Sequence, residues 1–335
     1  MLSLRRGACA CALNFAVIVW HNAASVMPQR SMTACPVTSG SDAMTDQPAI
    51  RRGVEELADG YDAFILDLWG VLHDGLKAYP DAVAAMQALK ARGKRLLLLS
   101  NAPRRTEDLA RQMANLGLSP DSYHHLMSSG QDAWTHLRDR PCDWYRGLGR
   151  RMLHIGPPHD ANMRDGLDVS LVHDVQFAEF VLNTGPALQS TEIGPLEPVL
   201  RQAADRELPM ICANPDIRVM RGDAVELCAG ALAKRYEELD GEVRYHGKPY
   251  QGIYDSCFKL LDDPDPARTL AVGDTLHTDI SGARQAGLDS AFVPGGINAG
   301  DLGIRMGELP ETDKLAQLFA REGECPTHVI PAFRW

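Results

Sequence analysis

The chain has 335 residues, of which 45% are hydrophobic and 23% charged, an ordinary composition for a protein that buries a full core. Its formal net charge of -10 at pH 7 comes without a basic stripe, which argues against a nucleic-acid partner. The eight cysteines show no paired Cys-x-x-Cys spacing, so the sequence favours reduced thiols in a cytoplasmic protein over a structural zinc site.

The first 43 residues differ in character from the rest of the chain. Arg5 and Arg6 precede an apolar stretch over 8–20, as in a signal peptide, but no Ala-x-Ala cleavage site follows. This stretch is too short to span a bilayer, and Asn14 interrupts it. We therefore predict that residues 1–43 are a disordered extension or a mis-assigned start, that the fold begins near Met44, and that the protein is cytoplasmic with no membrane partner.

Three short apolar runs read as buried strands, over 63–69, 95–101 and 269–274. Near-continuous apolar runs of this kind are typical of parallel strands that are covered on both faces. Between the first two lies 80–94, an amphipathic helix with a proline at its start and a glycine near its end. Strand, helix and strand in this order predict an α/β fold with a doubly wound parallel sheet.

The stretch 139–240 reads as a second α/β unit, inserted between the second and third core strands. Its strand-like runs are 151–156, 177–185 and 208–214, with a helical segment over 195–207. We therefore predict an α/β cap domain over 139–240 and a core domain assembled from 44–138 and 241–335.

Polar side chains stand at the ends of the three core strands. Asp67, Ser100 and Asp274 each close a different strand. Because ligands of doubly wound sheets bind outside the carboxyl ends of the strands, these three residues predict a functional site at that edge.

Four segments carry a family resemblance. They are Asp67 in DLWGVL, Ser100 and Asn101 in LLLLSNAPR, Lys248 in YHGKPYQGIY, and Asp274 with Asp279 in VGDTLHTDISGARQAG. In this order they resemble the hydrolases of the haloacid dehalogenase superfamily, from about residue 60 to about residue 300. The inserted unit, with CANPD (212–216) and CAGALAKRYEEL (228–239), resembles the class IIA members, which are NagD-like and p-nitrophenyl phosphatase-like. The resemblance implies a Rossmannoid core with an α/β cap.

The resemblance gives these residues chemical roles. Asp67 would attack phosphorus and form an aspartyl-phosphate. Ser100 and Asn101 would bind the phosphoryl group, and Lys248 would offset the charge that develops there. Asp67 and Asp274, with the main-chain carbonyl of Trp69, would hold Mg²⁺.

Each position also has an ordinary structural interpretation. Asp279 would either bind the metal, directly or through a water, or cap the helix that follows it. Ser100 could cap the next helix, and Lys248 could be a plain loop lysine. Asn214 and Asp216 are candidates for substrate binding or for a contact that closes the cap, whereas Asn183–Gly185 reads as a turn.

Trp69 departs from the usual pattern of the superfamily. Its phosphatases usually carry a second aspartate two residues after the nucleophile, where it acts as general acid and base. An indole has no group that titrates near neutral pH. His73 and Asp74 are the nearest substitutes, and His246 and His277 are weaker candidates.

The sequence thus predicts a Mg²⁺-dependent hydrolase that acts on a small phosphorylated metabolite, of the sugar- or nucleotide-phosphate type. The alternative is a weak or inactive member that binds a phosphorylated ligand, because Trp69 replaces the general acid. Cleavage of a carbon–halogen or carbon–phosphorus bond on the same scaffold is a third hypothesis. Arg104 and Arg105 could meet an anionic substrate or could be solvated. Assembly into a homo-oligomer is left open, as are the substrate and the choice between Mg²⁺ and Mn²⁺.

Overall fold

The computed structural model describes residues 47–186, 191–221 and 224–335. The extension predicted over 1–43 lies outside these residues, and so that prediction stays untested. Within the described ranges, none of the helices combines the length and the apolar character that crossing a membrane requires.

A seven-stranded sheet forms the larger of the two main sheets. Its strands, in spatial order, are β1 (Ala49–Ile50), β14 (His328–Val329), β13 (Asp289–Phe292), β12 (Thr269–Gly273), β2 (Ala63–Asp67), β3 (Arg95–Ser100) and β4 (His125–Ser128). Every neighbouring pair is parallel, which confirms the predicted doubly wound parallel sheet. The three strands that the sequence predicts, β2, β3 and β12, are neighbours at its centre.

Helices cover both faces of this sheet. They are α1 (Pro80–Ala91), α2 (Thr106–Asn115), α7 (Gln251–Leu260), α8 (Ser281–Gln285), α9 (Ala299–Leu302) and α10 (Thr312–Glu322), while α3 (Ser129–Asp139) packs in the cap. Successive side chains of a strand point to opposite faces. Phe64 and Leu66 of β2 accordingly pack in one apolar cluster with α1, while Ile65 packs in a second cluster with α7 and α8. Burial on both faces explains why these strands read as continuous apolar runs.

The observed strands end where the polar residues begin. Strand β2 ends at Asp67, two residues before the predicted end, because the chain turns at Gly70 with a φ of 77°. Strand β3 ends at Ser100, and Asp274 is the first residue after β12. The carboxyl ends of three adjacent parallel strands therefore carry the three residues that the sequence placed there.

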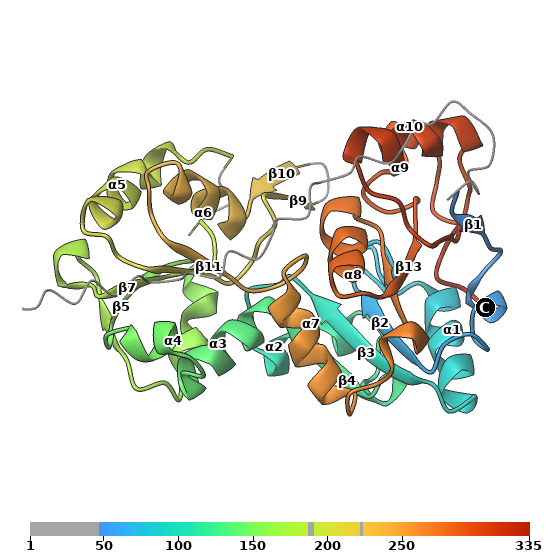
Figure 1. The fold of residues 1–335 in the computed structure, drawn as a ribbon, viewed down its shortest axis with the longest axis horizontal. Coiled ribbons are helices and arrows are strands. Elements are labelled where there is room, and N and C mark those ends of the chain that lie inside the picture. The colour runs from blue at the N-terminus through green and yellow to red at the C-terminus, as the bar shows by residue number, and fades with distance from the viewer. Residues whose placement is uncertain (1–46, 187–190, 222–223) are drawn as a thin grey trace, which may run out of the picture. The chain divides into compact units, whose positions relative to one another are not determined.

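The second sheet has five parallel strands. In spatial order they are β11 (Val243–Tyr245), β8 (Met210–Cys212), β7 (Phe180–Asn183), β5 (Arg151–Ile155) and β6 (Ser170–Val172). Helices α5 (Glu197–Asp205) and α6 (Ala229–Glu237) cover one face, while α3 and α4 (Asp143–Gly147) cover the other (Figure 1). A separate antiparallel pair consists of β9 (Arg218–Arg221) and β10 (Ala224–Leu227). The α/β cap predicted from the sequence has this sheet as its framework.

Strand β11 lies beyond the cap boundary predicted at residue 240. It pairs in parallel with β8, so the five-stranded sheet extends to Tyr245. The strand has only three residues, and its central Arg244 is exposed, which leaves no apolar run for a sequence pattern to detect. We propose that the cap domain runs to this strand and that the return to the core follows it.

A core leucine of β3 provides a test of this packing. Leu98 is fully buried in the cluster that joins β2, β3, β12 and α1. We expect Leu98→Ala to lower the free energy of unfolding by about 2–5 kcal/mol in urea titrations, because it removes apolar contacts and leaves a cavity. The control is Leu76→Ala, since that side chain is 85% exposed and should change stability by less than about 0.5 kcal/mol. Equal effects of the two substitutions would contradict the burial described for β3.

Candidate active site

A cavity of about 1030 Å³ opens at the carboxyl ends of the core strands. Its lining contains all nine residues that the sequence assigned to the site: Asp67, Trp69, Ser100, Asn101, Asn214, Asp216, Lys248, Asp274 and Asp279. Seven come from the core segments and two, Asn214 and Asp216, from the end of cap strand β8. The structure thus brings together residues that are more than two hundred positions apart in the sequence.

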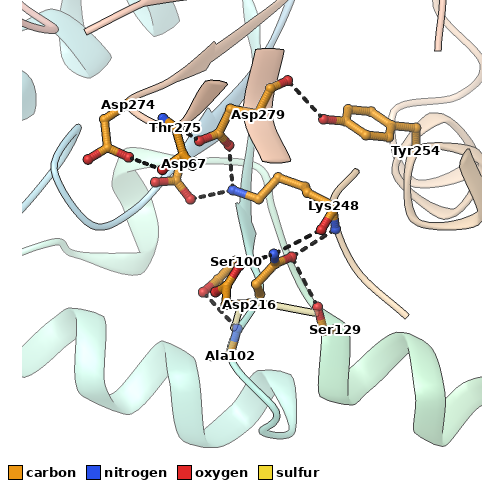
Figure 2. A network of polar contacts seen from close by, with 11 residues as sticks. Asp67, Ser100, Ala102, Ser129, Asp216, Lys248, Tyr254, Asp274, Thr275 and Asp279 are labelled. Atoms are coloured by element: carbon orange, nitrogen blue, oxygen red, sulfur yellow. Dashed lines mark hydrogen bonds and ion pairs between the residues drawn. The ribbon is translucent and has the colours of Figure 1, made fainter. Parts of the chain in front are cut away.

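Lys248 lies between two carboxylates. Its Nζ is 2.5 Å from Oδ1 of Asp67 and 2.6 Å from Oδ1 of Asp279 (Figure 2). Burial disfavours the charged form of Lys248, but Asp279 and Asp67 outweigh it and hold the pKa of the amine well above its usual value. Lys248 is therefore a fixed positive charge, and the interpretation as a plain loop lysine is wrong, because its side chain is only 5% exposed.

The side chain of Asn101 braces Lys248 through main-chain contacts. Its Oδ1 accepts from the amide of Lys248 at 2.8 Å, and its Nδ2 donates to the carbonyl of Lys248 at 3.0 Å. The same Nδ2 donates to Oδ1 of Asp216 at 2.8 Å. The hydroxyl of Ser129 donates to Oδ1 of Asn101 at 3.2 Å. The amide predicted to bind phosphate thus links the lysine to the cap residue Asp216.

Ser100 and Asn214 make local turns beside this network. Oγ of Ser100 accepts from the amide of Ala102 at 3.2 Å, so Ser100 does not cap helix α2, which begins only at Thr106. Oδ1 of Asn214 accepts from the amide of Asp216 at 3.0 Å. Both side chains line the cavity while they shape the loop that holds them.

Asp279 lies in a π-helical turn, Leu276–Ile280, before α8. Its Oδ2 accepts from the amide of Thr275, four residues earlier in the chain, at 3.1 Å. Its Oδ1 accepts from Nζ of Lys248. The residue at the start of α8 makes no side-chain capping bond. The alternative in which Asp279 caps the following helix is therefore wrong, and the turn directs this carboxylate toward the lysine instead.

Asp274 is held by the loop that follows β13. Its Oδ2 accepts from the amide of Ile297 at 2.8 Å, and Nδ2 of Asn298 donates to its carbonyl at 2.8 Å. Two glycines make room for it: a Cβ on Gly70 or Gly296 would lie 2.1 or 2.0 Å from that Oδ2. The pair Gly295–Gly296 was the sequence signal that could have revealed this contact.

The charges of the site do not balance without a cation. Carboxylate oxygens of Asp67, Asp274 and Asp279 lie within 4.8 Å of one another. Burial, and then the charges of Asp67 and Asp279, raise the pKa of Asp274 well above its usual value. Burial also raises the pKa of Asp279, to about 6, although Lys248 opposes this shift. Three clustered carboxylates against one lysine are a donor set that suits a hard divalent cation.

The carbonyl of Trp69 remains a fitting fourth donor. The main-chain bridge between Trp69 and His73 uses the carbonyl of Leu68 and the amide of Gly70, so it does not involve that carbonyl. The residues present therefore fit the metal that the resemblance implies.

The indole of Trp69 packs on the loop that follows it. Its ring lies 5.8 Å from the ring of His73, and a Cβ on Gly75 would come within 2.8 Å of it. The side chain is 40% exposed and lines the cavity. Trp69 therefore gives this part of the cavity an apolar surface that does not titrate.

The two nearest substitutes for an acid are engaged in the same loop. Nδ1 of His73 accepts from the amide of Gly75 at 2.9 Å, and burial lowers the pKa of His73 to about 4. Oδ1 of Asp74 accepts from the amides of Leu76 and Lys77, each at 2.8 Å. Near neutral pH, His73 is uncharged and Asp74 ionised, so neither is poised to donate a proton.

The two weaker candidates lie outside the cavity lining. His277 is 67% exposed and pairs with Glu322. His246 is buried between Asp132, at 2.6 Å from Nδ1, and the hydroxyl of Tyr145, at 2.5 Å from Nε2. Asp132 also accepts from Ser256 at 2.6 Å, so this buried group is internally bonded and serves to pack the chain near Lys248.

The two arginines after β3 differ in their surroundings. Arg104 lines the cavity, whereas the guanidinium of Arg105 lies 3.7 Å over the ring of Trp134 and donates to Gln131. Sequence reasoning missed Thr275, Ile297 and Asn298, which support the carboxylates, and also the cap residue Asp160, which lines the cavity.

Comparison with known proteins agrees with this geometry. A family model described as haloacid dehalogenase-like hydrolase matches residues 64–170, and a HAD-hydrolase-like model matches residues 245–318. A solved haloacid dehalogenase-like hydrolase from Brucella suis 1330 is 33% identical, with a TM-score of 0.71, and the match covers 84% of this chain and 99% of that one. The chain belongs to the haloacid dehalogenase-like hydrolases.

Relatives with named activities indicate the subclass of hydrolase to which the chain belongs. Chicken glycerol-3-phosphate phosphatase is 27% identical over 292 residues, which cover 77% of this chain and 90% of the relative. The ribonucleotide monophosphatase NagD of Escherichia coli K12 is 26% identical over 255 residues, which cover 71% and 89%. Within the family, the chain is a class IIA hydrolase of the NagD-like type.

The buried His73 predicts a pH-dependent stability. Because its folded pKa, about 4, lies below the usual 6.5, the unfolded chain takes up the proton first as the pH falls. Stability from this residue is thus complete above pH 6.5 and declines, by roughly 3 kcal/mol, down to about pH 4. His73→Asn keeps an acceptor for Gly75, and should flatten this part of the curve in urea unfolding from pH 7 to 4. The exposed His173→Asn is the control, and parallel curves for wild type and His73→Asn would contradict the assignment.

Proposed function

We propose that the protein is a Mg²⁺-dependent phosphatase that acts on a small phosphorylated metabolite through an aspartyl-phosphate on Asp67. The observation that carries the proposal is the carboxylate of Asp67, which lies 2.5 Å from the buried amine of Lys248 at the floor of the large cavity. The relatives named glycerol-3-phosphate phosphatase and ribonucleotide monophosphatase support a phosphoric monoester as substrate.

The reaction divides into two displacements at phosphorus. An oxygen of Asp67 forms a bond to phosphorus while the bond to the ester oxygen breaks, and the alkoxide leaves with the electron pair and takes a proton from solvent water. Water then attacks phosphorus, the bond to the Asp67 oxygen breaks, and inorganic phosphate leaves; the carboxylate is restored and the extra proton of the water passes to solvent. Lys248 offsets negative charge on the phosphoryl oxygens in both steps, and the hydroxyl of Ser100 would donate to them.

Asp67 and Asp274, with the carbonyl of Trp69, would hold the Mg²⁺. When bound, the ion supplies Lewis-acid stabilisation of the phosphoryl group and neutralises its charge. Asp279 has a different primary task, because its two oxygens contact Lys248 and the amide of Thr275. It orients the lysine, and it lies close enough to the metal residues to support a coordinated ligand.

A second candidate is a phospho-ligand-binding protein with weak turnover. The observation that favours it is the engagement of His73 and Asp74 in the loop beneath Trp69, which leaves the ester oxygen without an evident proton donor there. General acid catalysis contributes about 10²–10⁴-fold. A phosphatase without it should prefer esters whose alcohols are acidic, such as 4-nitrophenyl phosphate.

The nucleophile is tested by Asp67→Asn in the full-length protein with a panel of phosphomonoesters. We expect wild-type turnover that needs Mg²⁺ and stops with a chelator, and a loss of about 10⁴-fold or more in kcat for the variant, because an amide cannot form the aspartyl-phosphate. The control is Asp59→Asn, whose side chain is 97% exposed and should leave the rate unchanged. Phosphate binding without turnover by the wild type would reject the phosphatase and leave the ligand-binding candidate.

The tryptophan is tested by comparing Trp69→Asp with Trp69→Asn. Both remove the indole, but only the aspartate restores a group that can carry a proton. We expect Trp69→Asp to exceed Trp69→Asn in kcat by about 10²-fold or more, with the larger gain for alkyl than for aryl phosphates. Equal rates would show that the missing acid does not limit turnover. Loss of folding in both would assign the indole a packing role on Gly75.

A further inference from the structure

Asp160 is a buried carboxylate without a hydrogen-bond donor. It lies in the 3-10 turn Pro158–Arg164 of the cap, directly after β5, and its side chain is 1% exposed. Within the described part of the chain, neither of its carboxylate oxygens has a hydrogen-bond partner. Buried carboxylates are normally paired or multiply hydrogen-bonded, because the loss of water otherwise costs several kcal/mol.

The groups around Asp160 compensate its charge only from a distance. Nε of Arg104 lies 3.9 Å from Oδ1, and Nε2 of the exposed His159 lies 3.5 Å from it. Arg104 donates instead to Gln112 at 2.9 Å. The hydroxyl of Thr184 lies beside the carboxylate and favours its ionised form, but it also contacts Nε2 of His154 at 2.9 Å. Burial raises the pKa of Asp160, while these neighbours favour its ionised form.

The position of Asp160 is built by its surroundings. Gly156 precedes the turn, and a Cβ there would lie 2.0 Å from Oγ1 of Thr184. Pro157 and Pro158 then fix the backbone that leads to the carboxylate. Asp160, Arg104 and Thr184 all line the cavity that contains Asp67. A buried carboxylate without a close donor thus lines the same cavity as the nucleophile.

We propose that Asp160 is a specificity-determining residue that accepts hydrogen bonds from hydroxyl groups on the leaving alcohol, so that the substrate is a polyol or sugar phosphate. This inference rests on the proposed phosphatase function, and names the class of its substrate. Two adjacent hydroxyls match the two oxygens of one carboxylate, and a site that expects such donors discriminates strongly against an analogue that lacks them.

The neighbouring charges select among other donors. A substrate ammonium would approach the guanidinium of Arg104, and two cations close together repel each other. A second anionic group on the substrate would meet Asp160 itself. Neutral hydroxyls avoid both conflicts and replace the water that Asp160 has lost.

The test compares two esters that differ only in their hydroxyls. Glycerol 1-phosphate and n-propyl phosphate are assayed with full-length wild type and with Asp160→Ala and Asp160→Asn, in Mg²⁺. We expect wild type to favour the diol by at least about 30-fold in kcat/KM, and both variants to lower this preference to within about 3-fold. The variants should process n-propyl phosphate within about 3-fold of wild type. Asp165→Asn, an exposed carboxylate one residue beyond the same turn, is the matched control and should keep the preference.

The outcomes separate specificity from structure. If Asp160 only joined the cap to Arg104, its loss would lower kcat/KM for both esters alike and leave their ratio unchanged, which would overturn the proposal. Removal of a buried carboxylate without donors should not lower the thermal midpoint, so all variants are checked for folding. A wild type without preference for the diol also overturns the proposal.

The proposed function can fail separately. If wild type hydrolyses 4-nitrophenyl phosphate but shows no preference for the diol, the phosphatase stands and the role of Asp160 is rejected. If wild type hydrolyses none of the three esters, the phosphatase is rejected, and calorimetric titration of glycerol 1-phosphate and n-propyl phosphate in Mg²⁺ decides about Asp160. Tighter binding of the diol by about 10-fold, lost in Asp160→Ala, then supports its role, and equal binding rejects it.

Discussion

The contact of Lys248 with Asp67 and Asp279 is the interaction on which the rest of the site depends. Three carboxylates within 4.8 Å would repel one another strongly in a buried place. The ammonium of Lys248, at 2.5 and 2.6 Å from two of them, reduces this repulsion. The net charge of the cluster stays negative, which favours a bound cation. Loss of the lysine would leave buried charges unpaired, which costs far more than a surface ion pair provides.

The fold serves this contact by bringing three chain segments to one edge. Strands β2 and β12 are adjacent, so Asp67 and Asp274 leave the sheet side by side. Lys248 follows β11, the last strand of the cap sheet in the sequence. The side chain of Asn101, directly after β3, holds the main chain of Lys248 by two hydrogen bonds. Asn101 also donates to Asp216, which lies in the cap after β8. The position of the lysine is therefore tied to this part of the cap.

The sequence pointed to the residues that line the cavity, but not to the groups that hold them in place by hydrogen bonds. Asp67, Ser100 and Asp274 follow apolar runs whose burial on both faces can be read directly, and their strands ended within two residues of the predicted ends. Strand β11 and the supports from Ile297 and Asn298 were missed, since short exposed strands and main-chain donors leave no pattern of side chains. The direction of Asp279 depends on a π-helical turn, which spacing alone did not distinguish from a helix cap.

Trp69 and Asp160 together suggest that the core acts on the phosphoryl group while the cap recognises the alcohol part of the substrate. If the proposed phosphatase function holds, the core supplies the charges that act on the phosphoryl group, while the indole of Trp69 offers no titrating group beside the ester oxygen. Binding energy from distant parts of a substrate can be used to hold the reacting atoms in line, and well-oriented groups gain several kcal/mol in this way. Hydrogen bonds from a polyol to Asp160 would supply such energy from the cap. Under the two proposals, recognition by the cap offsets part of the missing acid catalysis at Trp69, and it does so only for substrates that carry the matching hydroxyls.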